Sequence, residues 1–208
     1  MKVLPEILAA LSPENLLAAY AQGIFPMVEG GRLMWFSPDP RGLMPLDERF
    51  HVSRSLARTI RRGVFACTVD NCFSEVMEFC SVRPGQGTWI SAEMKIAYGR
   101  LHEMGFAHSV ETWPADSAGR GVPVGGVYGV SIGGAFFAES MFHTRTDAGK
   151  VALVHLVGRL RDRGFAICDV QWTTAGLRRF GAFDVPRDQY LAALARAVPM
   201  RCTSVQSL

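Results

Sequence analysis

The sequence predicts an α+β fold built on a mixed sheet. Hydrophobic residues first follow helical spacing, then alternate with a period of two between Ala107 and Phe142, and then return to helical spacing before a further strand. Helices that precede and follow a run of antiparallel strands are typical of this class. The 208 residues, 49% of them hydrophobic and 20% charged, suffice for a full hydrophobic core.

The N-terminal section predicts a small domain of one helix and loops. Ser12 is placed to cap a helix that has Pro13 at its first position and ends before Gly23. The stretch 24–46 contains four prolines and three glycines, so long regular elements are not expected there. We therefore predict a boundary near Arg49, with a small N-terminal domain over residues 1–49 and a larger domain over residues 50–208.

The larger domain begins with predicted helices and continues with predicted strands. Cap and stop signals indicate helices from Ser53 to Gly63, through FSEVMEFC after Asn71, and from Ser91 to Met104. The alternating segments AHSVETW, PVGGVYGVSIG and AFFAESMF predict antiparallel strands, and the polar insert ADSAGRG predicts a loop between the first two.

The C-terminal third returns to helical spacing. Asp147 is expected to cap a helix that ends at Gly164, with apolar residues at i, i+3, i+4 and i+7. A strand, FAICDVQ, follows it. A short helix ending at Gly181, an extended stretch around AFDVP, and a last helix from Asp188 to about Ala197 complete the chain.

Composition points to a cytoplasmic protein without a metal or cofactor. No apolar run approaches the roughly 20 residues that cross a bilayer, and Glu6 and Glu14 interrupt the region where a signal peptide would be apolar. The five cysteines are odd in number and include no C-x-x-C pair, so neither a disulfide framework nor a zinc site is expected.

Four arginines on one predicted helix form a positively charged face, which we call the arginine stripe: Arg54, Arg58, Arg61 and Arg62. At about 100° per residue they fall within an arc of roughly 100°. Solvated helix faces usually interleave acids at i+4 spacing, but residues 54–62 contain none. The stripe therefore predicts phosphate binding, with a solvated surface helix as the alternative.

Aromatic residues lie beside an arginine in the segment LMWFSPDPRG. Trp35 and Phe36, which lie close to Arg41 in this segment, and the later Trp89 have the chemistry to stack an unpaired base of an RNA end. The pattern taken alone favours the alternative, in which the aromatic rings pack between the two sections.

The segment from Gly129 to Gly133 matches the G-x-S-x-G motif of serine hydrolases, with Ser131 as its serine. That motif requires a sharp turn from a strand into a helix. The residues that follow it here continue as a predicted strand, so we do not expect a hydrolase.

Two predicted strands carry polar side chains in otherwise apolar surroundings. Glu139 interrupts AFFAESMF, whereas Asp169 and Gln171 interrupt FAICDVQW and, being two apart, point to one face of their strand. Burying an unpaired charge is costly, so these residues indicate a functional site unless the acids pair with arginines or lie on a solvated face.

Eight segments of the chain are similar, in the same order, to blocks of one enzyme family, so the sequence resembles the leucyl/phenylalanyl-tRNA–protein transferase family along nearly its whole length. The segments are YAQGIFPM, WFSPDPRG, FHVSRSLARTIRRG, GTWI, YGRLHEMGFAHSVETW, VGGVYGVSIGGAFFAESMF, DAGKVALVHL and GAFDVPRDQYL. The resemblance implies a small N-terminal domain followed by a GNAT-like domain. It also implies transfer of Leu, Phe or Met from aminoacyl-tRNA to proteins with N-terminal Arg or Lys, which creates a degradation signal.

The resemblance implies residue roles as well. The arginine stripe would bind tRNA, Phe36 and Trp89 would contact the terminal adenosine, and Glu139, Asp169 and Gln171 would be catalytic. The pocket for the amino-acid side chain would be formed by Val127, Phe136, Phe137, Leu153, Leu156 and Cys168. Trp172 departs from the family pattern, because an aliphatic residue often follows the glutamine.

Chemistry constrains these roles. An α-amino group with a pKa of about 7.7 to 8.0 is on the order of one tenth neutral at pH 7, and the ester is already activated, so no strong base is needed. We expect the amide of Gln171 to orient the amine and Asp169 to fix the direction of that amide. Glu139 is expected to hold the amine or the cationic side chain of the acceptor, or to assist proton transfer.

Two other functions would each explain part of this sequence. A GNAT-type acetyltransferase would need a pyrophosphate loop for acetyl-CoA, but the segment from Arg145 to Lys150 lacks the first required glycine. A non-catalytic tRNA-binding module would explain the arginine stripe but leaves the polar strand residues without a purpose.

Overall fold

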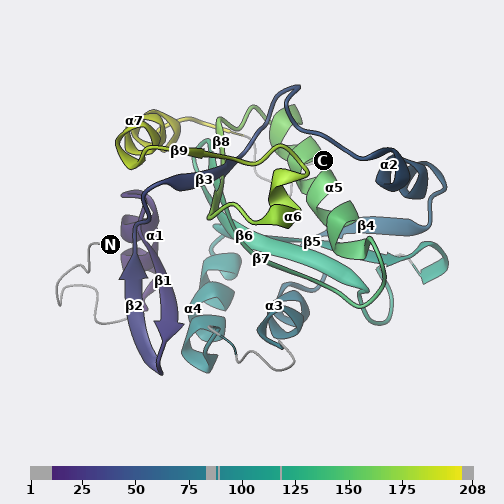
Figure 1. Cartoon of the computed structure of the whole chain (residues 1–208). Helices are drawn as coiled ribbons and strands as arrows, with labels where there is room; N and C mark the ends of the chain where they lie inside the picture. The colour runs from purple at the N-terminus through teal and green to yellow at the C-terminus, as the bar shows by residue number, and fades with distance from the viewer. Residues whose placement is uncertain (1–10, 83–87, 89, 118, 203–208) are drawn as a thin grey trace.

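The computed structural model describes residues 11–82, 88, 90–117 and 119–202 and is built around a seven-stranded mixed sheet (Figure 1). The strand order is β4-β5-β6-β7-β8-β3-β9, and β7 and β8 pair in parallel whereas the other neighbours are antiparallel. The strands are β3 (Arg41–Met44), β4 (Phe65–Val69), β5 (Ala107–Pro114), β6 (Gly125–Ile132), β7 (Ala135–His143), β8 (Ile167–Gln171) and β9 (Phe183–Val185). The predicted α+β class with a mixed sheet is confirmed.

Helices cover both faces of this sheet. Helix α5 packs on one face, and α3 and α4 pack on the other (Figure 1). The apolar residues accordingly form two buried clusters, one that includes α3 and α4 and one that includes α5. The helices are α1 (Pro13–Tyr20), α2 (Arg54–Arg61), α3 (Phe73–Ser81), α4 (Ala92–Glu103), α5 (Ala148–Asp162), α6 (Ala175–Arg178) and α7 (Arg187–Ala197).

The predicted helix starts are confirmed where a serine caps the helix. The side chains of Ser12, Ser53 and Ser91 each accept a hydrogen bond from the backbone N–H three residues on. Asp147 occupies the cap position of α5 at a φ of +68° and makes no capping hydrogen bond, and its Oδ1 instead accepts a hydrogen bond from Nζ of Lys150 at 2.8 Å. The expectation of a side-chain cap at Asp147 is therefore wrong.

The N-terminal section contains more strand than its composition predicted. Strands β1 (Phe25–Glu29) and β2 (Arg32–Phe36) form a hairpin, and its turn uses Gly30 and Gly31 at positive φ. Strand β3 then enters the large sheet between β8 and β9. These strands have four or five residues each, which is too short for an alternating pattern to stand out among prolines. The division at Arg49 stays a prediction.

Strand β4 was also missed, because FACTV offers only five residues of alternation, all half-buried against β5. The predicted continuation of β6 into another strand is confirmed. Ser131 lies within β6, and Gly133 forms the turn that leads directly into β7. The G-x-S-x-G segment thus has no strand-to-helix turn.

Candidate active site

A cavity of about 470 Å³ lies where the pairing of β7 with β8 ends. The last paired residues are Phe137 and Asp169, and the residues immediately beyond them on both strands line the cavity. Further walls come from β1, β6, α5 and α6. The cavity is thus built mainly on regular elements, which hold side chains more accurately than loops do.

The cavity has an aliphatic floor and an open mouth. Val127, Leu153 and Val170 line it with 4%, 2% and 8% of their surface exposed, whereas Trp172 and Met141 line it with 44% and 40% exposed. A buried aliphatic floor suits an apolar side chain, and an exposed aromatic ring at the mouth suits a planar group.

Aromatic packing fixes the Trp172 ring at this mouth. The ring meets Phe25 edge to face at a centroid distance of 5.3 Å and meets Phe36 at 6.3 Å. Trp35 and Phe36 are both buried, with 6% and 5% of their surface exposed, as the packing alternative requires. Phe36 thus packs against the Trp172 ring. Trp89, the other residue predicted to contact the adenosine, lies outside the described residues.

Glu139 and Gln171 face each other in the cavity. Nε2 of Gln171 donates to Oε1 of Glu139 at 3.4 Å, and both residues line the cavity wall. Each residue stands two positions beyond the last β7–β8 pair, so the two strands present them side by side. The structure therefore brings together two of the three residues that the sequence analysis named as catalytic.

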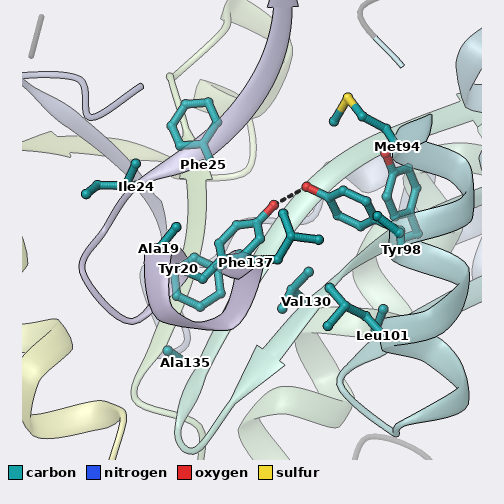
Figure 2. Packing of buried hydrophobic residues seen from close by; sticks show 14 of the residues in the cluster. Ala19, Tyr20, Ile24, Phe25, Met94, Tyr98, Leu101, Val130, Ala135 and Phe137 are labelled. Atoms are coloured by element: carbon teal, nitrogen blue, oxygen red, sulfur yellow. Dashed lines mark hydrogen bonds between the residues drawn. The ribbon is translucent and has the colours of Figure 1, made fainter. Parts of the chain in front are cut away.

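A chain of tyrosines connects Glu139 to the core. Its carboxyl group is hydrogen-bonded to the hydroxyl of Tyr20 on α1, which in turn is hydrogen-bonded to the hydroxyl of Tyr98 on α4. Figure 2 shows the two hydroxyls directed at each other across the packed side chains. Burial raises the pKa of Glu139 to about 8, the charge of Asp169 adds to the rise, and Tyr20 and Arg41 oppose it. Glu139 is therefore largely protonated at neutral pH and ionises just above it.

Asp169, the third predicted residue, lies outside the cavity lining and is fully buried in an ion pair with Arg41. Nε and Nη2 of Arg41 donate to the two carboxylate oxygens at 2.9 and 2.7 Å, and the Tyr190 hydroxyl donates to Oδ2 at 2.5 Å. Burial lowers the pKa of the guanidinium, but the Asp169 carboxylate raises it above its ordinary value. The Arg41 side chain is not exposed at all, so it offers no surface to a base.

Asp169 also contacts Gln171 differently from the expectation. Its Oδ1 accepts the backbone N–H of Gln171 at 2.9 Å, whereas the side-chain amide of Gln171 is directed to Glu139. Asp169 therefore holds the backbone of Gln171 and does not itself bind the amide. The cause is the positive φ of Gln171, +58°, which breaks the alternation that would place both side chains on one face.

The predicted side-chain pocket is divided between lining and supporting residues. Val127 and Leu153 line the cavity, whereas four other predicted residues are no more than 1% exposed and are absent from its lining. These four are Phe136, Phe137, Leu156 and Cys168.

Sequence reasoning missed several residues of the site. Arg41, Tyr20 and Tyr190 carry polar groups that reach Asp169 or Glu139 from distant segments, and no local pattern marks them. The alternative in which the acids pair with arginines holds for Asp169, because a buried carboxylate requires a cationic partner, but no pattern marks Arg41 as that partner. Arg41 was considered only as a neighbour of aromatic residues.

The arginine stripe lies on the solvent side of α2. All four arginines are exposed, and Leu56, on the opposite side of the helix, is the buried residue of α2. Within the described part of the chain, none of the four makes an ion pair. The stripe thus presents uncompensated positive charge to solvent, as phosphate binding requires.

Metal-binding and membrane-spanning features are absent from the described residues. No group of three or more His, Cys, Asp or Glu side chains among them is placed to hold a metal ion. None of their helices is both long and apolar enough to span a membrane.

Comparison with known proteins gives closely similar relatives. A transferase named leucyl/phenylalanyl-tRNA–protein transferase from Magnetococcus marinus is 51% identical, over 90% of this chain and 80% of the relative. Relatives of the same name from Herpetosiphon aurantiacus and Akkermansia muciniphila are 50% and 47% identical and are covered over 97% and 96% of their length. The solved structure of L-PGS from Bacillus licheniformis aligns with a TM-score of 0.47 and 11% identity, over 90% of this chain and 77% of that one.

Family models match both parts of the chain. The model described as leucyl/phenylalanyl-tRNA protein transferase matches residues 43–195, and the model of its N-terminal domain matches residues 9–39. With these matches and relatives about 50% identical over most of its length, the chain belongs to the leucyl/phenylalanyl-tRNA–protein transferase family and is an aminoacyltransferase.

Proposed function

We propose that this chain transfers leucine, phenylalanine or methionine from aminoacyl-tRNA to the α-amine of proteins that begin with Arg or Lys, and so creates a degradation signal. The observation that carries this proposal is the Gln171–Glu139 pair at the wall of a cavity with an aliphatic floor. Such a cavity holds an apolar aminoacyl group next to two polar groups that can meet an amine. Because both substrates are cytoplasmic, we place the reaction in the cytoplasm.

We place the donor with its side chain on the floor and its adenosine at the mouth. Val127 and Leu153 would contact the leucyl or phenylalanyl side chain, with Phe136, Phe137, Leu156 and Cys168 packed behind as support. The exposed Trp172 ring would stack on the terminal adenine, a role shared with Trp89, which lies outside the described residues. The arginine stripe would bind phosphates of the tRNA.

We assign the acceptor amine to Gln171 and Glu139. Because Nε2 of Gln171 is directed at Glu139, its Oε1 is left to accept a hydrogen bond from the amine and orient the nitrogen lone pair. The amine nitrogen forms a bond to the ester carbonyl carbon, and the bond from that carbon to the ribose oxygen breaks. A carboxylate with a pKa of about 8 matches the amine, so Glu139 would take the amine proton and return one to the ribose oxygen.

Labelled leucyl-tRNA and a peptide that begins with Arg test the proposal. We expect label to enter the peptide, to fail to enter an N-acetylated peptide, and to enter a peptide that begins with Ala far more slowly. Gln171→Ala should lower kcat by about 100-fold with little change in KM for the donor. Binding without transfer would favour a tRNA-binding module, and turnover of acetyl-CoA would favour an acetyltransferase.

A further inference from the structure

Gln171 holds a backbone conformation that glutamine does not favour by itself. Its φ is +58°, and the N–H of Trp172 donates to the carbonyl of Val170 at 2.7 Å, which closes a three-residue turn with Gln171 at its centre. Turns of this kind with a positive φ are rare and strained, and residues other than Gly, Asn and Asp seldom occupy them. Groups outside the turn must therefore hold it in place.

The Asp169 carboxylate provides this hold from inside the protein. Oδ1 accepts the N–H of Gln171, and the remaining acceptor positions are taken by Arg41 and Tyr190. The carboxylate is fully buried and does not line the cavity. Asp169 thus acts on the backbone of the turn rather than on a substrate.

Arg41 fixes the carboxylate in position and in rotation. Its planar guanidinium donates to both oxygens of Asp169, and its Nη1 donates to the carbonyl of Gly23 at 2.9 Å. The rings of Phe25 and Tyr190 lie 4.9 and 4.6 Å from the guanidinium carbon. Because all of these contacts form at once, the Arg41 guanidinium can take only one orientation.

Gly42, the residue after Arg41, packs against the backbone of the same turn. Gly42 pairs with Gln171, and a Cβ at Gly42 would lie 2.8 Å from the backbone nitrogen of Thr173 and 2.9 Å from the carbonyl carbon of Trp172. No side chain fits there. Strand β3 therefore supplies both the backbone that covers the turn and the arginine that anchors Asp169.

We propose that Arg41 is a positioning residue for the transfer reaction: through Asp169 it holds the Gln171 turn, and with it the side-chain amide, where the acceptor amine is met. This inference rests on the role proposed for Gln171. It predicts that Arg41 affects the rate of transfer and not the binding of the donor.

Arg41→Lys tests the proposal, because a single ammonium keeps the charge but cannot reproduce the fork. We expect kcat to fall about 10- to 100-fold, with KM for aminoacyl-tRNA within about twofold of the parent. Hydrogen exchange at the backbone amide of Gln171 should become faster. Arg49→Lys is the matched control, since Arg49 makes the same fork with Asp47 on the surface, and it should leave the rate unchanged.

The double variant Arg41→Lys/Gln171→Ala decides whether Arg41 acts through Gln171. It should be no slower than Gln171→Ala alone, because the amide that Arg41 positions is already gone. Losses that multiply would show a merely structural role and overturn the proposal. Tyr190→Phe, which removes one hydrogen bond to Asp169 and keeps the ring over Arg41, repeats the test if Arg41→Lys fails to fold.

The two proposals fail in different ways. Full activity in Gln171→Ala would remove the orienting role of Gln171, and with it the positioning role of Arg41, although transfer itself would still be shown. A slow Gln171→Ala together with an unchanged Arg41→Lys would overturn the positioning role of Arg41 and leave the proposed function intact.

Discussion

Nε2 of Gln171 lies 3.4 Å from Oε1 of Glu139, and the two residues stand at equivalent positions on adjacent parallel strands. Pairing between β7 and β8 ends two residues earlier, at Phe137 and Asp169, so both side chains lie at the cavity where these two strands separate. The carboxyl group and the amide therefore keep a fixed separation that is set by backbone geometry.

The pH dependence of transfer should reveal the ionisation of Glu139. Two groups must lose a proton before reaction in the proposed mechanism: Glu139, with a pKa of about 8, and the acceptor amine, with a pKa of about 7.7 to 8.0. Below pH 7 the slope of log kcat/KM against pH for the acceptor should approach about 2 in the parent and about 1 in Glu139→Gln. Equal slopes in the two proteins would exclude Glu139 as the proton acceptor.

The same carboxyl group should make stability fall as pH rises. Folding raises the pKa of Glu139 from 4.5 to about 8, so between these values the folded state binds more protons than the unfolded state. The unfolding free energy contributed by this group is thus highest below pH 4.5 and is lost progressively up to pH 8. Glu139→Gln should be more stable than the parent at pH 8, by on the order of 4 kcal/mol, and nearly equal to it at pH 4.5.

Urea denaturation of the two proteins at several pH values measures this difference. Glu139→Asp serves as a control, because it keeps a titratable group at the site. A stability difference that stays constant between pH 5 and pH 8 would contradict the raised pKa.

Substitution of the arginine stripe should weaken tRNA binding without altering chemistry. Arg58→Ala/Arg61→Ala removes two charges that make no ion pair within the described residues, and each lost phosphate contact should reduce the salt slope of log K by about 0.9. Filter binding of aminoacyl-tRNA at several salt concentrations measures the slope.

A small donor separates binding from chemistry in that variant. Transfer from phenylalanyl-adenosine, which lacks the tRNA body, should proceed at the parental rate. The charge-matched variant Arg100→Ala/Arg196→Ala, on α4 and α7, is expected to bind tRNA normally. A salt slope unchanged in the stripe variant would remove α2 from the tRNA interface.

Trp172 should contribute to donor affinity through stacking. Loss of a base–aromatic stack costs about 1 to 3 kcal/mol, so Trp172→Leu should raise KM for phenylalanyl-adenosine by roughly 5- to 150-fold. Trp172→Phe keeps a ring at the cavity mouth and should lose much less. If Trp172→Leu changed kcat and left KM alone, the ring would act on the neighbouring Gln171 turn instead.

Local patterns predicted the helices and the central strands well. The serine caps of α1, α2 and α4 and the alternation in β5 to β7 depend on neighbours in sequence, and each appears where it was expected. The arginine stripe could be predicted for the same reason, because its members share one helix.

Features that depend on distant contacts could not be predicted in this way. The partnership of Arg41 with Asp169 joins residues 128 positions apart, and the positive φ of Gln171 follows from that partnership and from the backbone at Gly42. The period-two pattern predicts that Asp169 and Gln171 point to one face of β8. The turn centred on Gln171 breaks this alternation. Four of the predicted pocket residues lie one layer behind the cavity lining, since a buried apolar residue gives the same sequence pattern whether it lines a cavity or supports one.

Strand β3 and helix α1 carry Arg41 and Tyr20, and both precede the predicted boundary near Arg49. A fragment that starts at residue 50 would keep Glu139, Asp169 and Gln171 in its sequence, yet Asp169 would be a buried anion without its cation. Mixing such a fragment with a peptide of residues 1–49 offers a complementation assay. Full activity should return only when the peptide carries an arginine at position 41, and a peptide with lysine there should restore about 10- to 100-fold less, because the reaction centre is assembled from both segments.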